Sequence, residues 1–569
     1  MKGTYMYKQF DIAEPARWAL NYLTSMVDKK KDYLPYWLIN VTSNPSFARH
    51  CRVDDAELVA SWYEAIESVQ EILNTSQGSE VKAGFQRHLL KSWGPMGLRY
   101  HEKYPWTHSV HSSFHEMAYI LSALNRWQQK EPDNKEIAAR AQGLVKGLRE
   151  LVIQRKVRTF WSGDCEYGYK IYEFPNDVYM QDKGWDMSCC TGRGEQSIRN
   201  GILLHPLVKS FELFEDPVAL DLAEGIAEYG IGLSRYFSYD GQFFGHVHSA
   251  MWFASGLVLL GRLTDNERFL KKGKQIYDYV LSLSSSFGWV PEYARWRDPS
   301  EEFCETCCIK DMIECGFELI DAGYDEYWEV INNFVRNQLI EQQIKDVSFI
   351  GVDDAPDTVD TTYKNLDKRV AGGFSGGSEP NSISWQKFRS IAGCCVGTGP
   401  QAFNMVWKRI ITSTNNKTIV NLPIDSENVD VSVETGYPNF GWLRVNVKTS
   451  KDLYIRPYSF MTEKCSIKVN NRIIPLIYNN GLIYIPSVQK ADIVELSHPI
   501  KEKWVQETLR NTNYSVLWKG CDVVDIRPHG QPLRLYQRIE NVPYELPQKM
   551  NGKSQSNKIC EAKPTDQTP

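Results

Sequence analysis

The chain of 569 residues lacks a long apolar segment. Its first residues, M-K-G-T-Y-M-Y-K-Q-F, contain no apolar run of the length found in signal peptides. No later stretch approaches the about 18 apolar residues that a membrane-spanning helix needs. We therefore expect no membrane partner and a cytoplasmic protein, although a trimmed secreted form would look the same.

An excess of one charge is also missing. The 65 basic and 70 acidic residues are interspersed and give a formal net charge of -5. A protein that binds a phosphate backbone needs a concentrated basic surface, and this sequence does not predict one. Nucleic acid is therefore not expected as a partner. The composition does not exclude that the chain forms a homodimer.

The 13 cysteines do not form the pattern of a disulfide-bonded secreted protein, because their number is odd. Adjacent cysteines make poor disulfides, since the required geometry is strained within one peptide unit. Clustered thiols in a reducing compartment indicate either small buried side chains or metal and redox chemistry, and both interpretations stay open for any one doublet. Three adjacent doublets occur: Cys189 with Cys190, Cys307 with Cys308, and Cys394 with Cys395.

Strand patterns are scarce between Asp54 and Ile411, where amphipathic helical stretches alternate with short polar breaks. In an early example, Asp54 or Asp55 can cap a helix whose apolar residues recur at helical spacing from Leu58 to Leu73. The chain is longer than one hydrophobic core usually supports, so a second domain is expected beside this helical region.

A faint internal repeat runs through the helical region. Residues 211–229 align without gaps on residues 261–279, and a looser third copy begins at Glu318. Each copy ends one helix and starts the next, which predicts a repeating helical hairpin of about 50 residues. We expect about six such hairpins in a closed α/α toroid rather than an open solenoid, because the loops between them are long and rich in Trp, His and Gly.

After Lys417 the pattern changes to period two, with turn signals at Asn470-Asn471 and Asn479-Asn480-Gly481. This alternation predicts a C-terminal antiparallel β-sandwich after a mostly α-helical domain. The expected divisions are an N-terminal segment at 1–40 that could pack on the C-terminal domain, a toroid at 41–415, a β-sandwich at 416–545 and a disordered tail at 546–569.

Two cysteine-rich segments are the strongest candidates for chemistry. The first contains Cys304, Glu305, Cys307 and Cys308, and the second contains Cys394 and Cys395. Zinc binds thiolates and carboxylates in a tetrahedron, and a Glu-x-Cys pair with a distant cysteine doublet supplies four such groups. The Cys-x2-Cys from Cys304 to Cys307 could instead be half of a structural zinc site, but no second half of that form follows.

These motifs resemble the β-L-arabinofuranosidases of glycoside hydrolase family 127. The resemblance comprises the Glu-x-Cys element, the later cysteine doublet followed by a Gly/Pro turn and a helix, and a V-N-L strand that opens a β-domain. It extends from about residue 40 to residue 540 and includes His205, in a His-Pro pair, and His246, in a Gly-His pair. The turn after the doublet is V-G-T-G where the family has a proline-rich turn, which leaves the sugar specificity open.

The resemblance implies an α/α toroid with a zinc ion held by Glu305, Cys307, Cys394 and Cys395. It also implies that Cys394 is the nucleophile and that Glu292 is the acid/base of a retaining glycoside hydrolase. The expected substrate is an oligosaccharide or glycoside that carries a β-linked L-arabinofuranose or a related pentose or deoxysugar. A second interpretation of Glu292 is a surface carboxylate paired with Arg295 or Arg297.

Several further residues are candidates for binding the sugar. Neutral imidazoles suit hydrogen bonding to hydroxyl groups, and an indole face can stack on a sugar ring. A metal site at His246-x-His248 is not favoured, because no carboxylate stands at helical spacing from that pair. His115 is the candidate from a cluster that also contains His108 and His111. The candidate substrate-binding residues are His115, His205, His246, His248, Trp289 and Glu379.

Two other functions remain open. A sugar isomerase or epimerase on the same toroid would use histidines for proton transfer and would need no zinc thiolate. A non-catalytic carbohydrate-binding protein with a structural zinc is the other, because four protein ligands ordinarily describe a closed and inert site.

Overall fold

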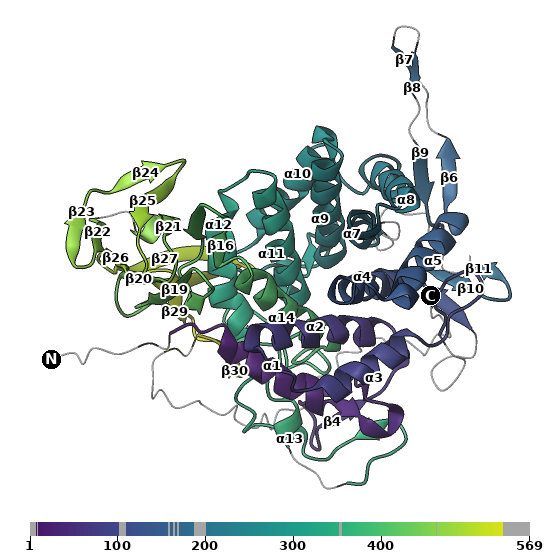
Figure 1. Ribbon diagram of the computed structural model, residues 1–569. Coiled ribbons are helices and arrows are strands. Elements are labelled where there is room, and N and C mark those ends of the chain that lie inside the picture. The colour runs from purple at the N-terminus through teal and green to yellow at the C-terminus, as the bar shows by residue number, and fades with distance from the viewer. Residues whose placement is uncertain are drawn as a thin grey trace.

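The computed structural model describes residues 7–538 except 8, 102–109, 157–159, 163–164, 168–169, 187–197, 199–200, 352–354, 462–463 and 537. The helices occupy the centre and right of Figure 1, and most of the C-terminal strands lie on the left. None of the described helices is long and apolar enough to cross a membrane. The predicted tail at 546–569 lies outside the described residues, and the domain limits at 40, 415 and 545 remain predictions.

Six of the described helices form a closed inner ring. Each of them packs against the next, and the last returns to contact the first. The ring consists of α2 (Glu57–Leu73), α4 (Phe114–Lys130), α7 (Leu204–Phe214), α9 (Val247–Leu263), α11 (Thr306–Asp321) and α14 (Gly393–Trp407). This closure confirms the predicted toroid.

An outer helix covers each inner helix. Five of the outer helices follow their inner partner in sequence: α3 (Ser79–Leu89), α5 (Lys135–Leu151), α8 (Pro217–Glu228), α10 (Glu267–Leu283) and α12 (Tyr327–Phe334). The sixth is α1 (Ala13–Ser25), which contacts α14 and α2. The N-terminal region thus packs on the toroid through α1, while the backbone N–H of Tyr7 donates to Asn439 Oδ1 at 2.8 Å in the C-terminal region.

The predicted repeat is confirmed as helix, short turn and helix. Asp216 and Asn266 occupy the same place in the two aligned copies, and each side chain caps the second helix of its hairpin. The predicted cap of α2 is wrong, because this helix begins after Ala56 without a side-chain cap. Asp54 instead accepts hydrogen bonds from the backbone N–H groups of Trp37 and Cys51.

Helix α14 closes the ring by a close approach to α2. A Cβ atom on Gly397 would lie 2.0 Å from Ser61 Oγ and 2.8 Å from Ser61 Cβ. The indole N–H of Trp62 donates to the carbonyl oxygen of Gly393 at 2.8 Å, between buried atoms. Only glycine leaves room for this contact, so the packing of α14 on α2 depends on Gly397.

Short strands line the loops of the toroid, where the sequence predicted few. They form a three-stranded sheet β14-β4-β3, a three-stranded sheet β11-β10-β5 and several two-stranded ladders. Their bounds are β1 (Val27–Asp28), β2 (Leu34–Pro35), β3 (Leu38–Asn40), β4 (Phe47–Arg49), β5 (His111–Ser113), β6 (Ile153–Lys156), β7 (Phe160–Ser162), β8 (Cys165–Tyr167), β9 (Lys170–Glu173), β10 (Val178–Met180), β11 (Gly184–Trp185), β12 (Gly245–His246), β13 (Tyr293–Ala294), β14 (Thr361–Thr362) and β15 (Ser382–Ile383).

Two larger sheets form the predicted β-sandwich. Strands β16 (Ile411–Ser413), β17 (Lys417–Val420), β21 (Lys451–Ile455), β25 (Leu482–Val488) and β24 (Ile477–Asn479) form the first. Strands β18 (Ser426–Glu427), β19 (Val431–Thr435), β20 (Trp442–Val447), β26 (Ile493–Ser497), β22 (Ser466–Val469) and β23 (Arg472–Ile474) form the second. Neighbours are antiparallel except β17 and β21, which are parallel.

The predicted turns of the sandwich are present. Asn470 and Asn471 have φ angles of 50° and 65° between β22 and β23, and Asn480 and Gly481 have 48° and 77° between β24 and β25. Consecutive positive φ angles are typical of tight hairpin turns, which favour Asn and Gly. Burial alternates along β20, as the period-two pattern predicted.

A third sheet joins the sandwich to the toroid and was not delineated from the sequence. It contains β27 (Glu502–Leu509), β28 (Thr512–Lys519) and β29 (Asp522–Arg527), and β30 (Leu533–Arg534) pairs with β15. Arg336 Nη2 lies 3.0 Å from Asp522 Oδ2, and both side chains are buried. Asn337 Oδ1 accepts from the backbone N–H of Val523 at 2.8 Å, so the sheet is attached at a fixed place.

Replacing Gly397 by alanine is expected to destabilise the protein by about 1–3 kcal/mol, because the added methyl group overlaps Ser61. The free energy of unfolding from urea titration measures the effect. Gly143→Ala is the control, since it lies in α5 with no atom within 4 Å of its added Cβ. This control should be neutral or stabilise by up to about 1 kcal/mol. Equal stability of the two variants would contradict the tight closure.

Candidate functional site

The first turns of five inner helices meet at one end of the ring. Glu305 is the N-cap of α11, and Cys394 lies in the first turn of α14. His246 is the N-cap of α9, and its Nε2 lies 3.7 Å from Glu305 Oε2. At α4 and α2, His115 Nε2 lies 3.7 Å from Glu57 Oε2. The positive ends of the helix dipoles favour thiolate and carboxylate groups at this place.

Four donor groups form a compact cluster, which we call the Cys/Glu cluster: Glu305, Cys307, Cys394 and Cys395. Their donor atoms all lie within 4.8 Å of one another. The sulfur of Cys395 is 3.6 Å from that of Cys307 and 3.9 Å from that of Cys394. Glu305 Oε1 is 3.5 Å from Cys394 Sγ and 3.8 Å from Cys395 Sγ.

These separations fit the edges of a metal tetrahedron. With bonds of about 2.3 Å to sulfur and about 2.1 Å to oxygen, a tetrahedral zinc site has donor–donor edges of about 3.5–3.8 Å. Glu305 Oε2 is buried and has no hydrogen-bond partner among the described residues. The cluster could therefore hold a metal ion, and three thiols with one carboxylate are a donor set that suits zinc.

The three thiols of the Cys/Glu cluster differ in acidity and exposure. Hydrogen bonds from the thiols of Cys307 and Cys395 lower the pKa of Cys394 to about 6. Burial raises the pKa values of Cys307 and Cys395 well above their ordinary value. Cys394 is 9% exposed, whereas Cys307 and Cys395 are completely buried. Cys394 is therefore the thiol that is both most easily deprotonated and accessible.

Glu305 is held in its charged form. Burial raises the pKa of its carboxyl group, but the adjacent imidazole of His246 outweighs burial and holds this pKa at about 2. A permanently charged carboxylate can bind a cation and cannot deliver a proton near neutral pH.

Glu292 lies beside the Cys/Glu cluster, and its donor oxygen is within 4.8 Å of donor atoms of His246 and Glu305. Its Oε2 accepts hydrogen bonds from Arg297 at 2.8 Å and from Arg389 at 2.7 Å. The predicted pairing with Arg297 is present, but the interpretation as a surface carboxylate is wrong, because Glu292 is only 8% exposed. Arg389, which the sequence did not single out, immobilises this carboxylate.

His248 belongs to a buried hydrogen-bonded chain. Its Nδ1 is bonded to the carboxylate of Asp311, and its Nε2 lies 2.8 Å from the hydroxyl oxygen of Tyr119. Burial lowers the pKa of His248, but the Asp311 charge outweighs burial, so the pKa is raised. The imidazole also stacks on Trp252, with ring centroids 5.9 Å apart.

Glu57 is a site residue that the sequence reasoning missed. It occupies the first position of α2 and is 6% exposed. Burial raises its pKa well above the ordinary value, and the neighbouring charge of Cys394 adds to this effect. The signal in the sequence is an acidic residue in the first turn of the helix, two positions after Asp55, but the helix dipole alone favours a carboxylate there.

Three predicted substrate-binding residues contact other groups. His205 Nε2 lies 3.8 Å from Glu318, which is 11 residues after Cys307 in α11, or about 16 Å along the helix axis. The indole of Trp289 is 2% exposed and donates to the carbonyl oxygen of Ser378, so no face is free to stack on a sugar. Glu379 forms an ion pair with Arg510 at 2.9 Å.

The remaining thiols lie outside the Cys/Glu cluster. Cys304 Sγ accepts from the backbone N–H of Val290 at 3.3 Å, and Cys308 is completely buried. Among the described residues, Cys304 does not join Cys307 in a group of metal donors, so the structural half-site is absent. His108, Cys189 and Cys190 lie outside the described residues.

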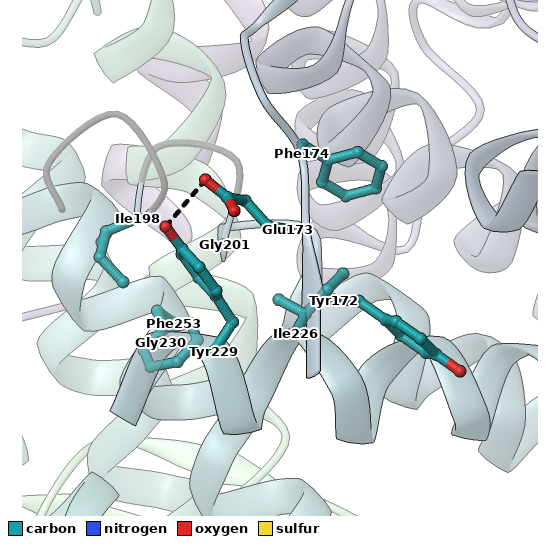
Figure 2. A pocket seen from close by; sticks show the side chains of 9 residues that line it. All are labelled: Tyr172, Glu173, Phe174, Ile198, Gly201, Ile226, Tyr229, Gly230 and Phe253. Carbon is teal, nitrogen blue, oxygen red and sulfur yellow. Dashed lines mark hydrogen bonds between the residues drawn. The ribbon is translucent and has the colours of Figure 1, made fainter. Parts of the chain in front are cut away.

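A separate cavity beside β9 and α8 is too small for a sugar. Figure 2 shows it between Tyr172, Phe174 and Phe253, with a volume of about 10 Å³. The hydroxyl of Tyr229 donates to Glu173 at 3.0 Å across it. This volume has room for about one water molecule.

The sequence matches no protein-family model and no curated protein sequence. Among solved structures, it is similar to a family 127 β-L-arabinofuranosidase from Geobacillus stearothermophilus T6, with 14% identity, TM-score 0.54, and coverage of 90% of this chain and 80% of that chain. A second structure, a glycoside hydrolase, has 12% identity and TM-score 0.58, and the match covers 91% of this chain and 81% of that chain. A third, a family 127 β-arabinofuranosidase, has 13% identity and TM-score 0.58, and the match covers 91% of this chain and 84% of that chain.

The chain has the fold of family 127 β-L-arabinofuranosidases. At this level of identity the likeness concerns the arrangement of the helical ring and the C-terminal sheets.

If the Cys/Glu cluster holds zinc, protein purified without added metal should contain about one zinc per chain. Cys307→Ser should reduce this content strongly, because serine is a poor zinc ligand. Mass spectrometry of the purified protein measures the metal. Cys315→Ser is the matched control, since Cys315 is a buried thiol of the same helix outside the cluster. Folded wild-type protein that takes up no zinc would rule out the site.

Proposed function

We propose that the protein is a retaining glycoside hydrolase that releases a β-linked L-arabinofuranose, or a related pentose or deoxysugar, from an oligosaccharide or glycoside. The observation that carries the proposal is the Cys/Glu cluster, in which the accessible thiol of Cys394 stands next to Glu305 and close to Glu292. The shared fold with family 127 β-L-arabinofuranosidases supports the choice of sugar.

The cluster would hold zinc through Glu305, Cys307, Cys394 and Cys395. Bound zinc would keep these thiols deprotonated at neutral pH. The low pKa of Cys394 points the same way, because a thiolate rather than a thiol is the nucleophile.

In the first step, Cys394 Sγ attacks the anomeric carbon. A carbon–sulfur bond forms while the glycosidic carbon–oxygen bond breaks, and Glu292 gives a proton to the departing oxygen. In the second step, Glu292 accepts a proton from a water molecule whose oxygen attacks the same carbon. The carbon–sulfur bond breaks, Cys394 regains its charge, and two inversions leave the configuration retained.

Two arginines contact Glu292, the proposed acid and base of both steps. Arg297 and Arg389 both donate to Glu292 Oε2, so they hold this carboxylate in a fixed position beside the Cys/Glu cluster. The leaving oxygen in the first step and the water molecule in the second step have to reach this carboxylate beside the two guanidinium groups. In this proposal His246 and His115 bind sugar hydroxyl groups, whereas both ring nitrogens of His248 are already bonded, to Asp311 and Tyr119.

Cys394→Ser should abolish hydrolysis of an aryl β-L-arabinofuranoside, because a serine hydroxyl is a far weaker nucleophile at neutral pH. Steady-state kinetics and the metal content of the same sample should be measured together. Turnover close to the wild-type rate would contradict the role of Cys394.

Glu292→Gln should slow substrates with poor leaving groups by about 10²–10⁴-fold and substrates with good leaving groups much less, because only the former need the proton. A series of aryl glycosides that differ in leaving-group pKa measures this. Glu434→Gln is the control, since Glu434 is an exposed carboxylate of β19 in the C-terminal sandwich. Full activity of Glu292→Gln on every substrate would show that another group is the acid.

An inert structural zinc site is the second candidate, and four protein ligands favour it. In that case the protein would bind carbohydrate without hydrolysing any glycoside, and Cys394→Ser would unfold the chain together with loss of metal. A folded, inactive Cys394→Ser variant that retains sugar binding would favour the hydrolase.

A further inference from the structure

A large pocket lies outside the Cys/Glu cluster, between the N-terminal strands and the loop before β14. Its volume is about 800 Å³, which is within the range of small-molecule sites. Its walls come from η1 (Lys29–Lys31), β2, β3, β4, η2 (Arg52–Asp55), the end of α3 and the loop that follows α3. We call it the N-terminal pocket.

The N-terminal pocket carries an excess of positive charge. Five of its lining residues are Lys or Arg and two are Asp, in a chain whose formal net charge is -5. The basic residues are Lys31, Arg49, Arg52, Lys91 and Arg99. Low-dielectric walls of one charge sign concentrate the field and attract small ions of the opposite sign.

Most of the charges in the wall are already paired. Arg99 Nη2 lies 3.5 Å from Asp55 Oδ2, and Asp55 is also 3.2 Å from His101 Nδ1. Lys91 Nζ lies 3.9 Å from Asp32. Asp360 accepts hydrogen bonds from hydroxyl groups of its own loop. These contacts hold the wall in place and leave those residues little capacity for a ligand.

Arg49 and Arg52 differ from the rest. Neither guanidinium group forms an ion pair with a described residue, and the hydrogen bond found for them joins Arg52 Nη1 to His111 Nε2 at 3.4 Å. Arg49 lies over the ring of Phe47, with its guanidinium carbon 5.2 Å from the ring centroid. Burial raises the pKa of Asp360, and hydrogen bonds from Thr358 and Thr361 and the charge of Arg49 counter this effect. The charge of Arg52 counters the effect of burial on the pKa of Glu57 and of Glu116 in the same way. These carboxylates therefore offset part of the charge of the two arginines.

The two arginines are therefore available to an anion. They stand three residues apart, at the end of β4 and the start of η2, and they flank His50 and Cys51. A guanidinium group presents parallel N–H donors that match the oxygens of a carboxylate or a phosphate. Leu34, Leu38 and Val359 add apolar surface against which a ring could pack.

We propose that the N-terminal pocket binds a small molecule that carries an oxyanion, held by Arg49 and Arg52. The chemical class is a sugar or sugar-sized compound with a carboxylate or phosphate group. The lining of this pocket contains no residue of the Cys/Glu cluster, so its ligand binding does not require that the proposed hydrolase activity is correct.

Isothermal titration of the full chain with inorganic phosphate, D-galacturonate and neutral L-arabinose tests the proposal. At low salt, at least one of the two anions should bind the wild type. The double variant Arg49→Gln/Arg52→Gln should weaken that binding by about tenfold or more, because charged hydrogen bonds are lost. Arg17→Gln is the control, since Arg17 is an exposed arginine of α1 away from the pocket.

The outcomes separate the sources of the oxyanion. Arginine-dependent binding of phosphate alone would assign a phosphorylated ligand, and binding of galacturonate alone would assign a carboxylate sugar. Arg49→Lys/Arg52→Lys, which keeps the charges, should fold like the wild type and bind more weakly, because paired N–H donors are missing. Equal affinity in the wild type and the Gln double variant, or no anion binding at all, would overturn the proposal.

Discussion

The closure of α14 on α2 is the contact on which the rest of the structure depends. Gly397 allows the two helices to touch at Ser61, and Trp62 bonds to the backbone of Gly393 at the first turn of α14. This contact places Cys394 and Cys395 at the end of the ring where α11 begins. Without it the two halves of the Cys/Glu cluster, which are nearly 90 residues apart in sequence, would not meet.

Buried charges in the ring orient the side chains of the site. Lys310 Nζ lies 2.9 Å from Glu314 Oε2 and 3.4 Å from Asp311 Oδ1, and all three residues are buried. Asp311 in turn holds His248, whose other nitrogen is bonded to Tyr119. Buried charges are tolerated when each is paired, and a paired network leaves few alternative rotamers. The imidazole of His248 is therefore presented in one orientation.

The C-terminal region contributes to the surroundings of Glu292. Arg510, in the turn between β27 and β28, pairs with Glu379 and lies 5.2 Å from the centroid of the Phe303 ring. Arg389, which binds Glu292, lies 5.6 Å from the same ring. Phe303 thus contacts both the arginine that pairs with Glu379 and the arginine that binds Glu292.

The sequence by itself determined the elements and the donor set. Asp216 and Asn266 mark the same turn in two repeats, because capping depends on residues only a few positions apart. The Glu-x-Cys and Cys-Cys motifs likewise identified the four donors. Only the tertiary structure decided which side chains reach them: Glu57 joins the site and His205 pairs with Glu318 instead. The physical reason is that these contacts arise from packing between helices that are far apart in the sequence. Trp62 and Gly393, for example, are 331 positions apart, and local propensity carries no information about such a contact.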